Sequence, residues 1–206
     1  MLEPLQPLQP RQYYLDVLGS GDILEDARRG RDIMKPFMLR RDFTRAYGFA
    51  ILTQETREEL VHFLGTKKVL DAGSGTGYIS KALHDAGVDV TAADNDHGSY
   101  GFETHHKRDV NADATSLLPG DFEAVLLVWP CYSKPFGHEV ISAMRAGQIL
   151  VFQGEGHGGC TADDAFFEEL ESERWSPLSE LSDKLNEGHI QFPGIHDTWS
   201  VYQRLA

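Results

Sequence analysis

Apolar and polar positions along the chain predict strands and helices in alternation. Short apolar runs with the length of buried strands occupy residues 67–72, 88–94, 122–129 and 148–154. Apolar residues that recur every three or four positions predict helices at residues 53–65, 76–86, 137–145 and 161–173. The run FEAVLLVW at 122–129 is almost continuously apolar, so we expect it in the centre of the sheet, buried on both faces.

Weaker patterns add three further strands. The segment HKRDV at residues 106–110 is a weak strand candidate between the second and the central strand. Near the end of the chain, HIQFPG at 189–194 and TWSVYQRL at 198–205 are rich in β-formers and predict an antiparallel pair at the sheet edge. Two helix starts are also marked, because Thr53 and Thr161 each have acidic or amide residues in the turn that follows.

These elements predict an α/β fold with a doubly wound, mostly parallel, seven-stranded sheet and an antiparallel C-terminal edge hairpin. Residues 1–52 are predicted to form an N-terminal leader and helical extension. Residues 53–206 then form the main domain. In such a sheet, ligands bind at the carboxyl ends of the strands, so the loops there hold the candidate site.

Composition and charge narrow the classes of function. The formal net charge is −13, which disfavours binding to the phosphate backbone of nucleic acids. Residues 28–45 nevertheless carry seven basic and two acidic side chains, which could receive an anionic substrate or simply be a solvated face. No apolar run is long enough to span a membrane, and no secretory signal is recognised.

Cysteine and histidine usage places few further constraints on the chain. The two cysteines, Cys131 and Cys160, do not form a disulfide framework, and we expect reduced thiols in a cytoplasmic protein. The histidines lack metal-ligand spacing, so no metal site is predicted. The sequence leaves the oligomeric state open.

The stretch LDAGSGTG, residues 70–77, is a glycine-rich turn between a strand and a helix. A dinucleotide fingerprint would need its third glycine at position 78, which is Tyr78, whereas this chain has Gly77. Asp71 lies just ahead of the turn, where a carboxylate would repel a pyrophosphate and favour a positively charged ligand. The pattern therefore argues against a dinucleotide and for a cationic cofactor.

LDAGSGTG resembles the first motif of the class I S-adenosylmethionine-dependent methyltransferases, which have a Rossmann-like fold, and the resemblance extends over about residues 47–204. It implies that Asp71 anchors the amino-acid end of S-adenosylmethionine, Asp94 the ribose and Asp113 the adenine amino group. Trp129 would line the path of the methyl group, and residues 47–56 could lie over the cofactor as a lid. The cofactor-binding residues implied are Asp71, Gly73, Ser74, Gly75, Gly77, Asp94, Asn95, Asp113, Ala114 and Trp129.

The end of the central strand, VWPCYSK, is similar to the [DNS]-P-P-[YFW] motif of methyltransferases that act on amino groups. Pro130 and Tyr132 fit this motif, but Trp129 replaces the polar residue and Cys131 the second proline. Two aromatic rings suggest a planar or cationic acceptor. The candidate substrate-binding residues are Tyr47, Trp129, Pro130 and Tyr132.

Candidate catalytic residues are Tyr132, Glu155 and His157, the last two in the glycine-rich loop after the strand at 148–154. For His157, an exposed loop position is the competing interpretation. The resemblance implies methyl transfer from S-adenosylmethionine to a small-molecule acceptor. The alternatives are an N-methyltransferase of nucleobases or protein side chains and a non-catalytic cofactor-binding partner or sensor.

Overall fold

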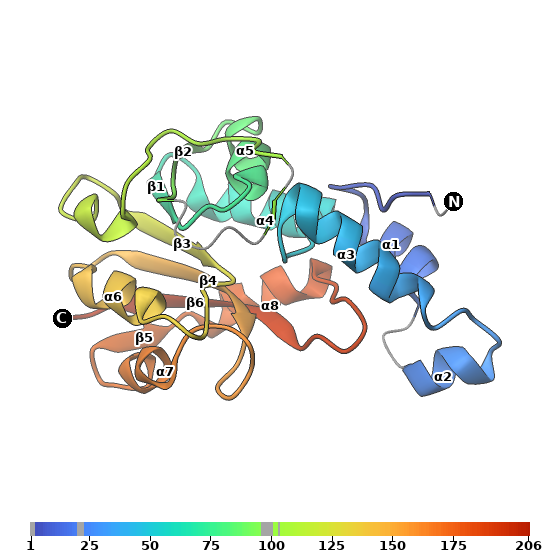
Figure 1. Cartoon of the computed structure of the whole chain (residues 1–206). Helices are drawn as coiled ribbons and strands as arrows, with labels where there is room; N and C mark the ends of the chain where they lie inside the picture. Colours follow the sequence, from blue (N-terminus) through green and yellow to red (C-terminus); the bar gives the residue numbers. More distant parts are fainter. Residues whose placement is uncertain (1–2, 20–22, 96–100, 103) are drawn as a thin grey trace.

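The computed structural model describes residues 3–19, 23–95, 101–102 and 104–206 (Figure 1). Its six strands are β1 (Lys68–Ala72), β2 (Asp89–Ala93), β3 (Ala124–Val128), β4 (Ile149–Glu155), β5 (Trp175–Pro177) and β6 (Asp197–Arg204). The helices are α1 (Arg11–Leu18), α2 (Ile23–Arg28), α3 (Lys35–Tyr47), α4 (Gln54–Leu64), α5 (Tyr78–His84), α6 (Phe136–Ala143), α7 (Asp164–Leu170) and α8 (Ser179–Gly188), with a 3-10 turn η1 (Ala114–Ser116).

The strands form one sheet in the order β2-β1-β3-β4-β6-β5. Strands β1 to β4 are parallel, whereas β6 runs antiparallel to both β4 and β5. The strand order reverses between β1 and β3, which makes the sheet doubly wound as predicted and opens a crevice at the carboxyl ends of these strands.

The described residues form six strands rather than the predicted seven. The candidate at 106–110 is reduced to an isolated parallel bridge between Val110 and Ala93. Asp109 and Val110 both donate their backbone N–H groups to the carbonyl oxygen of Ala92, at 2.9 and 3.1 Å. A strand inside this sheet must be apolar on both faces, and HKRDV has a single apolar residue. Its pairing therefore stops after this contact.

The antiparallel edge is confirmed, but the predicted hairpin partner is wrong. Strand β6 pairs with β4 along its length and with the short outer strand β5. The segment 189–194 is not a strand, because Ile190 and Phe192 are buried against the N-terminal helices instead. The pattern at 189–194 thus reflected burial, not strand pairing.

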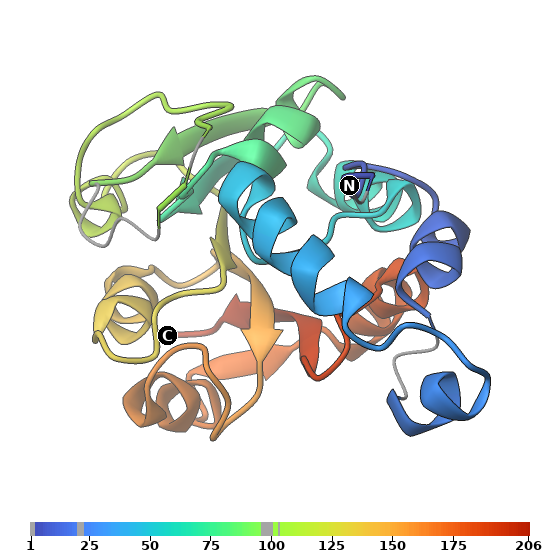
Figure 2. The same ribbon diagram turned by 45° about the vertical axis from the view of Figure 1, so that its right-hand side comes forward.

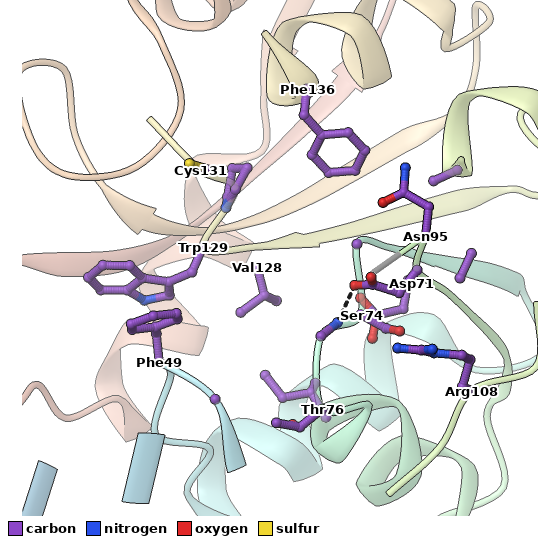
Figure 3. A pocket seen from close by; sticks show the side chains of 18 of the residues that line it. Phe49, Asp71, Ser74, Thr76, Asn95, Arg108, Val128, Trp129, Cys131 and Phe136 are labelled. Carbon is purple, nitrogen blue, oxygen red and sulfur yellow. Dashed lines mark hydrogen bonds between the residues drawn. The ribbon is translucent and has the colours of Figure 1, made fainter. Parts of the chain in front are cut away.

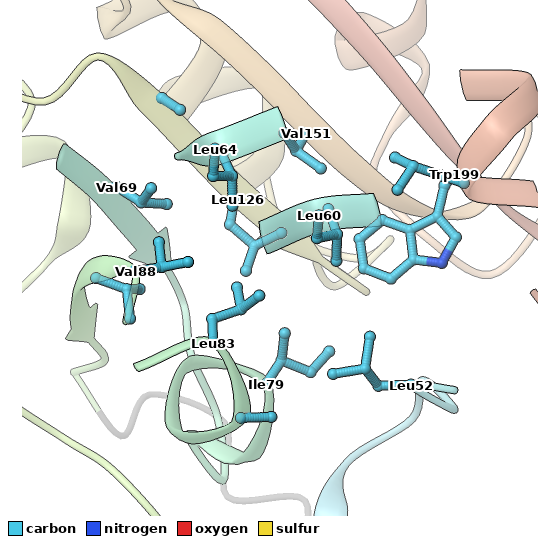
Figure 4. Close-up of a cluster of buried hydrophobic side chains, with 14 of the residues drawn as sticks. Leu52, Leu60, Leu64, Val69, Ile79, Leu83, Val88, Leu126, Val151 and Trp199 are labelled. Carbon is cyan, nitrogen blue, oxygen red and sulfur yellow. The ribbon is translucent and has the colours of Figure 1, made fainter. Parts of the chain in front are cut away.

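Alternating side chains of the parallel strands separate the core into two layers. On one face, Val69 and Leu126 pack with Leu60 of α4 and Leu83 of α5, while α8 contributes Leu185 (Figure 4). On the other face, α6 and α7 cover the sheet. The helices on both faces bury residues 124–127 of β3, as its continuous apolar run predicted, and Val128 at the end of the strand is partly buried.

Side-chain caps mark the N-terminal ends of α4 and α7. Thr53 caps α4, as predicted, and its hydroxyl oxygen accepts a hydrogen bond from Thr56 N at 3.1 Å. The cap of α7 is Asp163, not Thr161, whose hydroxyl instead donates to the carbonyl oxygen of Glu155. Helix α8 was not predicted, although leucines at positions 178, 181 and 185 follow a helical spacing.

The N-terminal helices form a separate layer beside the sheet (Figures 1 and 2). A third core cluster includes Tyr14, Leu39 and Phe43 of this layer together with Phe192. Helix α3 ends at Tyr47, beside the crevice. None of the helices in the described ranges is long and apolar enough to cross a bilayer.

The two phenylalanines of α3 are expected to differ sharply in their contribution to stability. Phe43 is 2% exposed and packs on Phe192 with ring centroids 5.7 Å apart, whereas Phe37 is 40% exposed. Phe43→Ala should lower the free energy of unfolding by about 3–5 kcal/mol, through lost burial and the cavity left behind. The matched control Phe37→Ala should change it by less than about 1 kcal/mol. Urea unfolding measures both, and equal losses would contradict this placement of α3.

Candidate functional site

A cavity of about 550 Å³ lies at the carboxyl ends of β1, β2 and β3, where the strand order reverses (Figure 3). Most of the predicted site residues line it: Tyr47, Asp71, Gly73, Ser74, Gly75, Asp94, Asn95, Asp113, Ala114, Trp129 and Pro130. The volume lies in the range of small-molecule and cofactor sites.

The glycine turn bends tightly around the start of α5. Gly73, Gly75 and Gly77 have φ values of 72°, 54° and 67°, in the left-handed region that favours glycine. The N–H groups of Gly73 and Ser74 donate to the carbonyl oxygen of Ala93, which ties the turn to β2. Gly77 does not line the cavity. Its role is steric, since a Cβ there would lie 1.7 Å from the carbonyl oxygen of Lys107.

Asp71 lies at the floor of the cavity and is 2% exposed. One carboxylate oxygen accepts a hydrogen bond from the Ser80 hydroxyl at 2.6 Å. Burial raises the pKa of Asp71 from its ordinary value of 3.8 to about 7; the Ser80 bond opposes the shift and the nearby charge of Asp94 adds to it. A cation bound here would therefore favour the ionised form of Asp71.

Asp94 follows β2 and faces the glycine turn. Its Oδ2 accepts a hydrogen bond from Gly75 N at 2.8 Å, so the carboxylate helps to hold the turn in shape. Asn95 continues the wall on the same side (Figure 3). Two carboxylates, Asp71 and Asp94, therefore converge on one side of the cavity.

Ser74 presents a polar atom with unused bonding capacity. Its hydroxyl oxygen is buried and has no hydrogen-bond partner among the residues that the structure describes. Because an unpaired buried hydroxyl is costly, a ligand that bonds to Ser74 would recover that cost.

Asp113 caps the η1 turn at another edge of the cavity. Its Oδ1 accepts hydrogen bonds from the backbone N–H and the hydroxyl of Thr115, at 3.0 and 2.8 Å. The following residue, Ala114, is buried and also lines the cavity. The cap fixes the loop that the resemblance assigns to the adenine.

Trp129 has the most unusual backbone in the cavity wall. Its φ of 51° lies in the left-handed region, which costs a bulky residue about 1–3 kcal/mol. Its indole N–H donates to Oδ2 of Asp197 at 3.1 Å, and its ring stacks on Phe49 with centroids 5.4 Å apart. The strain is tolerated because both ends of the residue are held by neighbouring strands.

Several residues of the wall were not predicted individually. Phe49, Phe102, Phe136 and Arg108 all line the cavity. Phe49 lies within the stretch proposed as a lid, and Arg108 lies in the weak strand candidate, so both had a sequence signal. Phe136 had none, because only folding brings the first residue of α6 against Gly73.

Tyr132, Glu155 and His157 do not line the cavity. Tyr132 is 60% exposed. The carboxylate of Glu155 is buried and accepts backbone N–H bonds from Cys160 and His196, at 2.8 and 3.1 Å. His157 stacks on Phe167 at the surface. The geometry therefore does not bring these candidate catalytic groups together with the cofactor-binding candidates, and Glu155 serves to organise the glycine-rich loop.

No protein-family model and no curated protein sequence matches this chain. Among solved structures, it is similar to a 1,6-didemethyltoxoflavin N1-methyltransferase from Burkholderia thailandensis with bound S-adenosylhomocysteine, at 18% identity, covering 100% of this chain and 94% of the other, with a TM-score of 0.48. It is also similar to the magnesium protoporphyrin IX methyltransferase of Synechocystis, with bound S-adenosylmethionine, at 14% identity, 94% coverage of each chain and a TM-score of 0.48.

A third similar structure is the geranyl diphosphate C-methyltransferase of Streptomyces coelicolor, at 12% identity, covering 72% of this chain and 78% of the other, with a TM-score of 0.44. Since these TM-scores lie below 0.5, the assignment of a Rossmann-like fold rests on the strand order and the helix layers of the chain itself.

Proposed function

We propose that the protein binds S-adenosylmethionine in this cavity and transfers its methyl group to a small-molecule acceptor. The observation that carries the proposal is the convergence of Asp71 and Asp94 beside the glycine turn, with the unpaired hydroxyl of Ser74 in the same wall. A cofactor with an ammonium, a sulfonium and ribose hydroxyls complements this set, whereas a pyrophosphate would meet two carboxylates.

Each of these residues has a defined task under the proposal. Asp71 would hold the ammonium, through water or directly, and Asp94 the ribose hydroxyls, while Asp113 and Ala114 would border the adenine. Bound there, S-adenosylmethionine supplies an electrophilic methyl group on a positively charged sulfur. Trp129 and Phe49 would then border the acceptor and exclude water from the reacting atoms.

The acceptor is better described as a planar small molecule than as an amino group held by the degenerate motif. The indole N–H of Trp129 is bonded to Asp197, so it is not offered to an acceptor. Tyr132, the aromatic residue of that motif, is exposed outside the cavity. These two placements weigh against the nucleobase or protein N-methyltransferase alternative. A non-catalytic sensor remains the second candidate, because neither assigned base, Glu155 nor His157, lines the cavity.

Calorimetric titration tests cofactor choice. We expect S-adenosylmethionine to bind with a micromolar-range Kd and NAD to bind far more weakly. Asp94→Ala should weaken S-adenosylmethionine binding by about 1–3 kcal/mol, because charged hydrogen bonds are lost. The matched control is Asp89→Ala, an exposed carboxylate at the opposite end of β2, which should leave the affinity unchanged.

Two results would contradict this function. One is preferential binding of NAD; the other is equal affinity of the wild type and Asp94→Ala for S-adenosylmethionine. To separate enzyme from sensor, formation of S-adenosylhomocysteine should be followed with a panel of planar small molecules. Turnover with any of them excludes the sensor.

A further inference from the structure

A buried polar cluster lies behind the cavity wall, on the antiparallel side of the sheet. Its centre is Asp197, the first residue of β6, which is 3% exposed. Its Oδ2 accepts hydrogen bonds from Trp129 Nε1 at 3.1 Å and Gln153 Nε2 at 2.6 Å. Its Oδ1 lies 3.2 Å from His189 Nε2, which fits the tautomer with the proton on that nitrogen.

The hydrogen bonds of this cluster are incomplete. The Oε1 of Gln153 and the Nδ1 of His189 are buried and lack hydrogen-bond partners within the described ranges. A partly satisfied buried network is less stable than an apolar core of the same shape. Stability alone therefore does not explain why a carboxylate occupies this place, and a positional role does.

The residue that the cluster holds is Trp129. Its backbone N–H donates to the carbonyl oxygen of Gln153 at 2.8 Å, and its indole N–H donates to Asp197. Strand β4 thus holds the backbone of Trp129, and strand β6 holds its side chain. A φ of 51° is uncommon for a bulky residue, and these two attachments hold Trp129 in that conformation.

The indole also forms the boundary of the cavity. Trp129 and Phe49 stack at an interplanar angle of 23°, and both line the cavity (Figure 3). Phe49 comes from the segment that joins α3 to α4, so the stack connects this segment to β3. The direction of the Trp129 indole ring therefore sets the shape of this wall and the position of the segment between α3 and α4.

We propose that Asp197 is the positioning residue for Trp129, and that the antiparallel strand β6 thereby shapes the acceptor side of the cavity. The carboxylate fixes the indole with its N–H turned away from the cavity, which leaves aromatic carbon as the surface offered to an acceptor. The consequence for acceptor binding rests on the proposed function. The positioning of Trp129 by Asp197 is independent of that function.

The proposal can be tested by NMR of the tryptophan indole N–H groups in the full chain. The chain has three tryptophans, and Trp129→Phe identifies the signal of Trp129 by its loss. Asp197→Asn removes the charge of the group that accepts the Trp129 hydrogen bond and leaves one acceptor oxygen in place of two. The Trp129 signal should shift, and its exchange with solvent should become at least about tenfold faster, as expected when a bond to a charged acceptor is lost.

Two internal controls accompany this measurement. The indole N–H of Trp175 donates to a different carboxylate, Glu169, at 3.1 Å, so its signal should stay in place. Thr198→Ala changes an exposed residue next to Asp197 in β6 and should leave the Trp129 signal unchanged. Global unfolding of Asp197→Asn would shift all three signals together, and Asp197→Ser then provides a smaller second variant.

The affinity for S-adenosylhomocysteine separates this proposal from the proposed function. In Asp197→Asn it should stay within about threefold of the wild type, because Asp71 in β1 and Asp94 directly after β2 are separated from β6 by β3 and β4. If no S-adenosylhomocysteine binds to the wild type but the Trp129 signal responds to Asp197→Asn, the proposed function fails and the positioning stands. An unchanged Trp129 signal and exchange rate in both Asp197 variants would overturn the positioning.

Discussion

Gly77→Ala is expected to lower the free energy of unfolding by at least about 4 kcal/mol, or to prevent folding. A Cβ at this position would lie 1.7 Å from the carbonyl oxygen and 2.6 Å from the carbonyl carbon of Lys107. Both are backbone atoms, so the clash cannot be relieved by the movement of a side chain. The φ of 67° adds a second cost, because alanine disfavours the left-handed region. Thermal and urea unfolding, with soluble yield as a first readout, measure the effect.

Gly87→Ala is the matched control. Gly87 also has a positive φ, 93°, but a Cβ there would meet nothing within 4 Å. It should cost only the conformational term, about 1–2 kcal/mol. Similar losses in the two variants would show that the segment at Lys107 does not pack on the glycine turn as described.

Asp71→Asn is expected to stabilise the ligand-free protein at alkaline pH. The folded-state pKa of Asp71 is raised to about 7 by burial, above its ordinary value of 3.8. Between these values the folded protein retains a proton that the unfolded chain has lost. The wild type should therefore lose stability as pH rises from about 4 to 7, by up to about 4 kcal/mol, and asparagine removes this loss.

Urea unfolding at pH 5 and pH 8 gives the required comparison. The stability advantage of Asp71→Asn over the wild type should be larger at pH 8 than at pH 5. The exposed Asp89, at the start of β2, supplies the control Asp89→Asn, for which the difference should not grow with pH. Identical pH dependence of Asp71→Asn and the wild type would mean that Asp71 already ionises at its ordinary pKa in the folded protein.

The same shift makes a prediction about the proposed cofactor. A cation bound beside Asp71 favours its ionised form, so binding of S-adenosylmethionine should release a proton below pH 7. Its affinity should then rise between pH 5.5 and 7.5 in the wild type, and this rise should be reduced in Asp71→Asn. Asp71→Asn should therefore gain stability and lose affinity, a combination that a purely structural aspartate would not produce.

The sequence by itself determined the elements that depend on local physics. The continuous apolar run of β3 required burial on both faces, and Thr53 marked the start of α4. The turn with Gly73, Gly75 and Gly77 is read directly, because its left-handed backbone restricts which residues can occupy it. The proximity of Asp71 and Asp94 could also be predicted from the sequence, because the carboxyl ends of neighbouring parallel strands meet at one edge of the sheet.

Only the tertiary structure decided which distant groups meet. The segment 189–194 has the composition of a strand but packs on the N-terminal helices, because burial of apolar side chains is not specific to one partner. Glu155 is the last residue of β4 and His157 follows the strand, yet their side chains point to the loop and the surface. The bond from Trp129 to Asp197 joins residues 68 positions apart, and no local pattern encodes such a contact. Its physical origin is the pairing of β4 with β6, which is a property of the whole sheet.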